Sequence, residues 1–430
     1  MLASAAVARI RTAFTVARFG AMFGALADNP HYRTFYLGNQ ANTLMWPMQL
    51  VANGYLAYTL TESATALGVV SLASALPQLL FAPLGGVLAD RLEKRKLLLS
   101  LQGINCLCSL AIGIALVLNV IQFWHLVVVA IIQGMVFSAM MPTRQSWIPS
   151  LVSREHLANA IALNNAGQNA ARVIGPSLAG LLIAIPWFTV NGIYFLRVVA
   201  FTWVLYTLMK IPIPGTPIQQ ERRTPLTRQL FTGLGYIWAH ATLMPLFTFA
   251  GVMMLLGQSY QQVMPAFALG IFDAGSEGLG LMLTVVGIGA LTGSLTMAYI
   301  SRRPDKARIQ AFTGTALGIA LALFGLSSAL HVFASALVAL FVVGLCLDFD
   351  STINNTLIMF NTEPAYYGRV MSVYMMTFAL APLGAFVAGW SIDHVGGAAT
   401  MLTAGLTLSI FVVGMATLHP GYRKIRNSPM

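Results

Sequence analysis

The sequence predicts an all-α membrane protein whose twelve transmembrane helices form two pseudo-symmetric six-helix bundles. Three observations predict it: the composition, the length of the apolar stretches and the placement of the basic residues. Hydrophobic residues make up 57% of the 430 residues, charged residues only 9%, and the mean hydropathy is +0.75. Soluble domains contain about 25% charged residues. This chain therefore lacks the polar surface that a soluble enzyme, a nucleic-acid-binding domain or a disordered protein requires.

The apolar stretches set the number of membrane crossings. A helix needs about 20 apolar residues to cross the hydrocarbon core of a bilayer. Stretches without Asp, Glu, Lys or Arg run through the whole chain, and those at 97–143, 229–272 and 309–347 are too long for one crossing. The expected helices cover residues 35–60, 66–89, 97–118, 123–146, 158–184, 189–210, 242–268, 277–300, 309–330, 333–358, 368–391 and 398–418.

The basic residues test this count independently. Of the 24 Lys and Arg residues, all but Arg172 and Arg197 lie in segments that are cytoplasmic if the N-terminus is inside. The external loops contain none, as the positive-inside rule requires. Adding or removing one helix would destroy this alternation. We therefore expect a multi-pass protein of the cytoplasmic (inner) membrane with both termini in the cytoplasm.

The segment from Ile211 to Arg228 divides the chain almost in half, since it contains four prolines and a cluster of charges. Residues 1–30 carry arginines among apolar residues, which favours an amphipathic helix on the anionic inner leaflet over a flexible tail. The expected segments are an N-terminal interfacial segment (1–33), a first bundle (34–210), a linker with an interfacial helix (211–241), a second bundle (242–418) and a cytoplasmic tail (419–430).

The turn between the second and third expected helices carries a recognisable motif, because residues 86–96 read GVLADRLEKRK. This resembles the loop signature G-x-x-x-D-R-x-G-R-R of the major facilitator superfamily, although Glu93 replaces its second glycine. The resemblance implies a gating loop in which the Asp90 carboxylate lies near the N-terminus of the eleventh helix, around Gly368. A basic turn that only fixes topology would leave Asp90 unexplained. The gating-loop candidates are Gly86, Asp90, Arg91, Lys94 and Arg95.

The fifth helix resembles the antiporter motif G-x-x-x-G-P-x-x-G-G of the same superfamily, since residues 171–180 read ARVIGPSLAG. Small residues at these spacings let helices approach closely, and the proline supplies a bend. Ordinary small-residue packing is the alternative interpretation. A third superfamily pattern is broken, because Ala130 occupies the arginine position three residues before Gln133. The matching residues are Gly175, Pro176 and Gly180.

Other phrases point to one branch of that superfamily. Residues 142–160 and 368–374 look like the enterobactin-exporter-like and macrolide-efflux-like carriers. The resemblance covers residues 30–418. It implies the major facilitator fold and an alternating-access mechanism, in which two bundles rock about a site near the middle of the membrane.

Two acidic residues lie inside the tenth expected helix. An ionisable group in hydrocarbon costs about 3 kcal/mol or more, so each is a candidate functional residue. Asp348 and Asp350 point to faces about 200° apart and cannot both line one cavity. We expect one of them to bind and release a proton while the other pairs with a cation, and the proton-coupling candidates are Asp348, Asp350 and Arg172. A static ion pair with Arg172 or Arg197 is the equally weighted alternative, and Arg197 itself is expected to partner an acid or backbone carbonyls.

Polar residues on the first helix form a stripe, because Asn42, Trp46, Gln49 and Asn53 follow the spacing i, i+4, i+7 and i+11. A single amide often only joins two helices. Three amides with a tryptophan fit a wetted wall that stacks on and hydrogen-bonds an amphipathic solute. The substrate-cavity candidates are Asn42, Trp46, Gln49 and Asn53, with Gln258 and Gln261 on the seventh helix.

Enzyme chemistry finds no support in the sequence. We find no phosphate-binding loop, no metal-ligand spacing and no cofactor motif, and the three cysteines form no disulfide pattern. The sequence instead predicts a secondary transporter that exports an amphipathic small molecule, drug-like or siderophore-like, by proton antiport. A proton-coupled importer of a small polar solute is the alternative, and a non-transporting sensor would leave the interior polar residues without a purpose. The expected partners are the small-molecule substrate, protons and the lipid bilayer, with no nucleic acid, and we expect a monomer.

Overall fold

A computed structural model describes residues 24–213, 215, 226–300, 305–363 and 366–427. Over these residues the chain forms helices joined by short turns and no strand. Ten helical segments in this described part of the chain are long and apolar enough to cross a membrane. Two further long helices, α3 and α7, are not among the ten because they carry series of amides. For these two, the expected count of twelve rests on their lengths of 32 and 28 residues alone.

The described part of the first half of the chain contains two short helices and six long ones. Their ends lie within a few residues of the expected ones, except that the first long helix begins earlier and the fourth ends later. The interfacial helix expected in residues 1–30 lies largely outside the described residues. The helices are α2 (Gly24–Asp28), α3 (Pro30–Thr61), α4 (Ala64–Arg91), α5 (Lys94–Val117), α6 (Phe123–Leu151), η1 (Arg154–His156), α7 (Leu157–Ala184) and α8 (Thr189–Lys210).

The second half repeats this plan with two interruptions. The seventh expected helix contains two π-helical stretches, and the eleventh is divided in two. Short helices stand where the linker and the tail were expected. The helices are α9 (Leu226–Ala239), α10 (Leu243–Val252), η2 (Met253–Gln258), α11 (Tyr260–Pro265), η3 (Ala266–Ile271), α12 (Gly275–Ile300), α13 (Lys306–Ala329), α14 (Phe333–Phe360), α15 (Tyr367–Thr377), α16 (Leu380–Val395), α17 (Gly397–Leu418) and α18 (Pro420–Asn427).

Pro382 explains the division between α15 and α16. Proline has no N–H to donate to the carbonyl four residues earlier, and its ring clashes with that carbonyl. The carbonyl in question belongs to Phe378, at the break. There Phe378 and Ala379 donate instead to the carbonyls three residues earlier, Met375 and Met376, at 3.3 and 3.1 Å.

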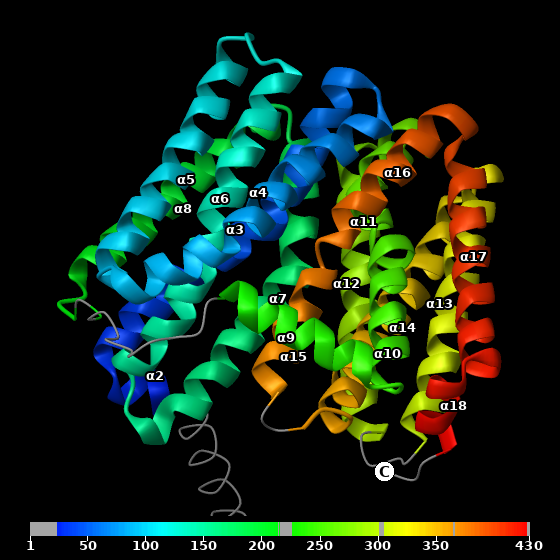
Figure 1. Ribbon diagram of the computed structural model, residues 1–430. Coiled ribbons are helices and arrows are strands. Elements are labelled where there is room, and N and C mark those ends of the chain that lie inside the picture. The colour runs from blue at the N-terminus through cyan, green and yellow to red at the C-terminus, as the bar shows by residue number, and fades with distance from the viewer. Residues whose placement is uncertain (1–23, 214, 216–225, 301–304, 364–365, 428–430) are drawn as a thin grey trace, which may run out of the picture.

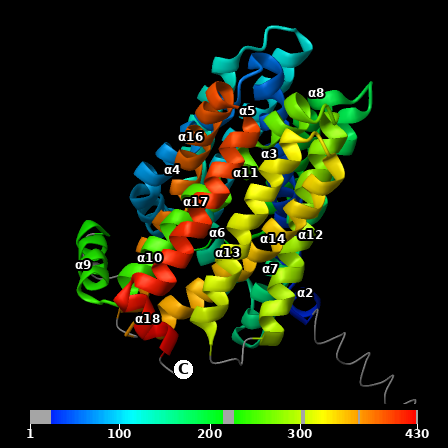
Figure 2. The same cartoon turned by 90° about the vertical axis from the view of Figure 1, so that its right-hand side faces the viewer.

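The helices form two groups that lie side by side (Figure 1). Helices α3 to α8 pack mainly with one another, as do α10 to α17, and the largest contacts between the groups join α4 to α16 and α7 to α12. Helices α2 and α18 lie at the same end of the molecule in both views (Figure 2). Large apolar side chains such as Leu295 and Ile410 are exposed on the outside, as lipid contact requires.

The hydrophobic core is shared between the two groups at one end of the molecule only. The largest buried cluster includes Leu56 and Leu67 from the first group and Phe267 and Leu279 from the second. Two smaller clusters are each confined to one group: the first extends from Ala25 to Ile211 and the second from Ile237 to Ile425. The groups are therefore joined by apolar packing at one end, while the buried apolar clusters beside α2 and α18 are separate.

Candidate functional site

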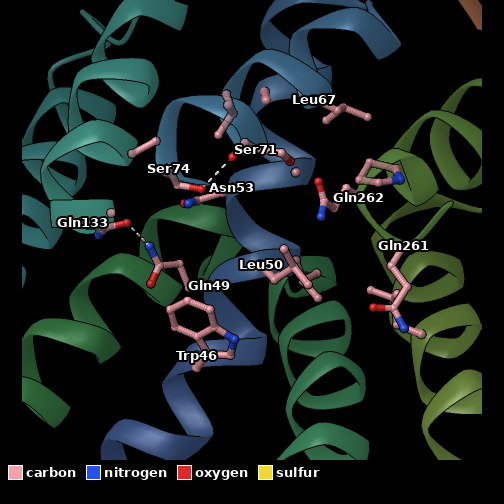
Figure 3. A pocket seen from close by; sticks show the side chains of 18 of the residues that line it. Trp46, Gln49, Leu50, Asn53, Leu67, Ser71, Ser74, Gln133, Gln261 and Gln262 are labelled. Atoms are coloured by element: carbon pink, nitrogen blue, oxygen red, sulfur yellow. Dashed lines mark hydrogen bonds between the residues drawn. The ribbon is translucent and has the colours of Figure 1, made fainter. Parts of the chain in front are cut away.

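A cavity of about 130 Å³ lies where the two groups of helices meet. Helices α3, α4 and α6 of the first group and α11 and α12 of the second form its wall (Figure 3). Its lining combines aliphatic and aromatic side chains with amides and serine hydroxyls, and none of its residues is charged. Such a wall suits a solute with both apolar and hydrogen-bonding parts.

The polar stripe of α3 forms one side of this cavity. Trp46, Gln49 and Asn53 all line it, whereas Asn42 is half-buried and is not part of the lining. Trp46 is 56% exposed, and its ring lies 4.8 Å from the ring of Phe137 on α6, measured between centroids. The cavity thus has an aromatic pair beside its amides, and stacking on these rings is available to a ligand.

Gln49 connects three helices. The Arg197 Nη2 of α8 donates a hydrogen bond to Gln49 Oε1 at 2.6 Å. Gln49 Nε2 in turn donates to Gln133 Oε1 of α6, as Figure 3 shows. Gln133 belongs to the broken superfamily pattern, and Ala130, which stands at its arginine position, also lines the cavity. A guanidinium therefore reaches this amide pair from α8 rather than from α6.

Arg197 is almost completely buried, with 1% of its surface exposed. Its Nε and Nη1 atoms have no hydrogen-bond partner, and no carboxylate lies within ion-pair distance of it among the described residues. The rings of Tyr194 and Phe201 lie 5.8 and 5.3 Å from its guanidinium carbon. The partner that the sequence suggested, an acid or a backbone carbonyl, is replaced by the side chain of Gln49.

Tyr194, one helical turn from Arg197, holds the second amide of the stripe. Its hydroxyl donates to Asn53 Oδ1 at 2.7 Å. Two side chains of α8 thus fix the side-chain orientations of both Gln49 and Asn53. Rotamers fixed in this way pre-organise a binding wall.

The opposite wall comes from α11. Gln261 and Gln262 line the cavity (Figure 3). Gln258 donates to Gln261 Oε1 at 2.9 Å without being part of the lining itself. Gln262 Oε1 has no hydrogen-bond partner within the described part of the chain. The side chain of Gln262 is therefore not held through its oxygen, in contrast to the fixed amides of α3.

At one end of the molecule a carboxylate joins the two groups. Asp393 of α16 accepts hydrogen bonds from the Ser63 and Thr65 hydroxyls, both at 2.6 Å, and from the backbone N–H groups of Ala64 and Thr65 at 2.8 and 2.9 Å. These groups form the N-terminus of α4, which attracts negative charge. The cavity is therefore closed towards this end by contacts that cross between the two groups.

The motif in α7 lies at the same interface. Gly175 packs against Pro47 of α3, and Gly180 packs against α12, where a Cβ would come within 2.5 Å of the Ser276 carbonyl and 2.7 Å of Gly280 Cα. Pro176 is buried between them. The small residues therefore permit close helix approach, both within the first group and across to the second.

The two acids of α14 have different surroundings. Asp350 is buried and accepts a hydrogen bond from the Thr313 hydroxyl of α13, while its Oδ2 atom has no partner in the described structure. Asp348 is half-buried and interacts electrostatically with Arg172 of α7, without an ion pair inside 4 Å within the described chain. Neither acid lines the cavity.

The turn between α4 and α5 places its basic residues mostly within the first group. Arg95 donates to the Leu208 and Met209 carbonyls at the end of α8, at 3.1 and 2.6 Å, and Lys94 is buried. Arg91 is exposed, Asp90 is half-buried, and nothing lies within 4 Å of a Cβ added at Gly86 or Gly368. The expected contact between Asp90 and the helix that begins near Gly368 stays a prediction.

Several cavity residues escaped assignment from the sequence. The sequence identifies Gln133 only as part of a broken pattern and does not predict Ser71, Ser74 and Gln78 of α4 as cavity residues, although all four line the cavity. A polar side chain every three to four residues along α4 was the available signal. Asp393 was likewise missed, because its partners are more than 300 residues away in sequence.

Comparison with known proteins confirms the predicted fold and the resemblance to the superfamily. The model of the Major Facilitator Superfamily matches residues 35–385. The staphyloferrin A transporter of Staphylococcus aureus is 23% identical over 378 residues, covering 86% of this chain and 90% of that protein. Macrolide efflux protein A of Streptococcus pyogenes is 22% identical, with 85% and 89% covered. The enterobactin exporter of Citrobacter koseri is 24% identical, with 74% and 71% covered.

Solved structures show the same fold at lower identity. The nucleoside transporter NupG superimposes with a TM-score of 0.71 at 14% identity, covering 92% of this chain and 99% of that one. A bacterial homologue of the iron transporter ferroportin, in an inward-facing state, gives 0.70 at 14% identity, with 90% and 99% covered.

Proposed function

Because this chain belongs to the Major Facilitator Superfamily, we propose that it is a proton-coupled exporter of an amphipathic small molecule, such as a drug-like compound or a siderophore. The chain is a multi-pass membrane transporter and not an enzyme. Export is the finer proposal, and the relatives named as an efflux protein and an enterobactin exporter support it.

The uncharged cavity of amides and aromatic rings carries this proposal. It lies between the two halves of the chain, where a rocking motion would expose it first to one side of the membrane and then to the other. A solute with an apolar body stacks on Trp46 and Phe137 and hydrogen-bonds the amides of α3 and α11. Burial of the apolar part of the solute then provides the affinity, and the polar groups determine its orientation.

In this proposal the end closed by Asp393 faces outside and the end beside α2 and α18 faces the cytoplasm. The basic residues of the described turns, such as Arg95, Arg154 and Arg308, belong to the second end, which the positive-inside rule places in the cytoplasm. The separate apolar clusters at that end suit a state that admits a cytoplasmic substrate. Outward release then requires the Asp393 contacts to break.

A retention assay in cells tests the direction. Deletion of an exporter raises the retention of a panel of fluorescent amphipathic dyes, and deletion of an importer lowers it. Complementation with Trp46→Ala should fail for at least one dye, because that substitution removes the exposed ring from the cavity. Trp187→Ala is the matched control, since Trp187 is 83% exposed in the turn after α7 and lies outside the cavity. Lower retention on deletion would overturn export.

A further inference from the structure

We propose that the cavity selects ligands that carry an oxygen anion, such as a carboxylate or phenolate, and that Arg197 is the residue that determines this preference. The inference rests on the proposed function, because it names the chemical class of the substrate that the same cavity takes. Three observations carry it: the direction of the hydrogen bonds around Gln49, the burial of Arg197 and the absence of charge from the cavity lining.

Donor and acceptor chemistry fixes the direction of the hydrogen bonds. A guanidinium has five N–H donors and no acceptor, so the side chain of Gln49 must present its oxygen to Arg197. The Gln49 nitrogen then faces Gln133, which must accept with its own oxygen. Tyr194 likewise engages the oxygen of Asn53. The oxygens of these three amides each accept a hydrogen bond from within the protein, so the N–H groups of the α3 and α6 amides are the groups that remain for a ligand.

The charge of Arg197 acts in the same direction. Its guanidinium is one amide away from the cavity, and no acid lines the cavity or pairs with it among the described residues. A buried cation without a counter-ion is costly, because water no longer stabilises it. By Coulomb's law, a unit charge roughly 8 Å from an anion raises its affinity roughly thirtyfold at an effective dielectric constant of about 20. A ligand anion thus supplies the counter-charge that the protein lacks, while a cation is repelled.

Equilibrium binding of two dyes to the purified full-length protein tests this preference. Fluorescein and rhodamine 6G share a xanthene frame, but fluorescein is an anion at neutral pH and rhodamine 6G is a cation. Fluorescence anisotropy should show fluorescein binding at least about tenfold more tightly. Equal affinities, tighter binding of rhodamine 6G or no saturable binding of fluorescein would each overturn the proposal.

Variants assign the preference to Arg197. Gln49→Glu places a carboxylate beside the guanidinium and neutralises its charge, so fluorescein affinity should fall at least about tenfold in the folded variant. Arg197→Lys retains the charge and should retain the preference. Gln145→Glu, exposed on α6, is the control for net charge and should change nothing. Unchanged fluorescein binding in Gln49→Glu would remove Arg197 from this role.

Measuring binding and transport separately distinguishes a failure of this inference from a failure of the proposed function. A protein that binds fluorescein selectively but moves neither dye across a proteoliposome membrane contradicts only the exporter proposal. A protein that exports rhodamine 6G and ignores fluorescein keeps the exporter proposal and contradicts the anion preference.

Discussion

The carboxylate of Asp393 at the end of α16 accepts the hydroxyl hydrogen bond of Ser63 at 2.6 Å, although the two residues belong to opposite halves of the chain. Together with the three further hydrogen bonds from Ala64 and Thr65, this contact caps α4 with a group from the other half. Hydrogen bonds to a charged acceptor contribute about 1.5–3 kcal/mol each. Asp393 is exposed, so water competes for these bonds and their contribution lies at the low end of that range. Opening this end breaks them, and one substitution weakens them.

Asp393→Asn should favour opening of this end, because a single amide oxygen replaces two charged acceptors. We expect a cysteine at Ala57, buried beside the cavity, to react about tenfold faster with a membrane-impermeant maleimide. The measurement uses a background in which the native Cys106, Cys108 and Cys346 are replaced. Asp273→Asn, an exposed acid in the turn before α12, is the control. Identical reaction rates in the two variants would contradict this function for Asp393.

Gly180→Ala should destabilise the contact between α7 and α12. The added methyl group would come within 2.5 Å of the Ser276 carbonyl and overpack the interface, at about 1–3 kcal/mol. Gly103→Ala on α5 meets no atom within 4 Å and should instead stabilise its helix by up to about 1 kcal/mol. Thermal unfolding of both purified variants measures the difference. A melting temperature for Gly180→Ala at or above that of Gly103→Ala would refute the close-packing argument.

Asp348→Asn should abolish transport driven by a pH gradient while still permitting downhill exchange of substrate. Asp348 lies across the interface from Arg172, so a proton or a shift of that arginine changes the charge balance between the two halves. Asp350→Asn tests the enclosed acid beside Thr313 in the same way. Transport in proteoliposomes with and without a pH gradient distinguishes them, with Asp305→Asn, an exposed acid before α13, as the control. Wild-type coupling in both variants would remove α14 from the mechanism.

Asp90→Asn should slow transport about tenfold and leave membrane insertion intact. A carboxylate at a helix N-terminus contributes up to about 2 kcal/mol, and the outward-facing state is where Asp90 would approach the start of α15. Transport rates and the amount of protein in the membrane are both needed. Glu155→Gln, an exposed acid in the turn before α7, is the control. A transport rate equal to that of Glu155→Gln would exclude this function for Asp90.

Much of the fold could be predicted because apolar length and basic turns are properties of the sequence itself. The expected helix at 189–210 has the same bounds as Thr189–Lys210, and the expected helix at 333–358 differs from Phe333–Phe360 by two residues. The break at Phe378 and Ala379, caused by Pro382, could not be predicted, since a proline in a helix either bends or interrupts the helix according to the packing around it. The π-helical stretches beside α11 depend on packing in the same way.

Part of the candidate site could likewise be predicted from the sequence, and part of it could not. Trp46, Gln49 and Asn53 could be grouped from the sequence because they share one face of one helix. The chain of contacts from Arg197 through Gln49 to Gln133 joins three helices, so its members become neighbours only when those helices pack. Helical spacing predicts which residues share a face, but it does not predict which face of another helix lies opposite.

The interruption at Phe378 and Ala379 also gives the eleventh transmembrane helix a hinge between its two segments, α15 and α16. Helix α16 is held against α4 by close packing and by the Asp393 contacts, while α15 packs against α9 and α10. An uninterrupted helix would transmit a tilt along its whole length. Two helical segments joined by a few longer hydrogen bonds can change their angle relative to each other. Motion of α15 can therefore begin while α16 is still held against α4, so the two ends of this helix need not move in the same step.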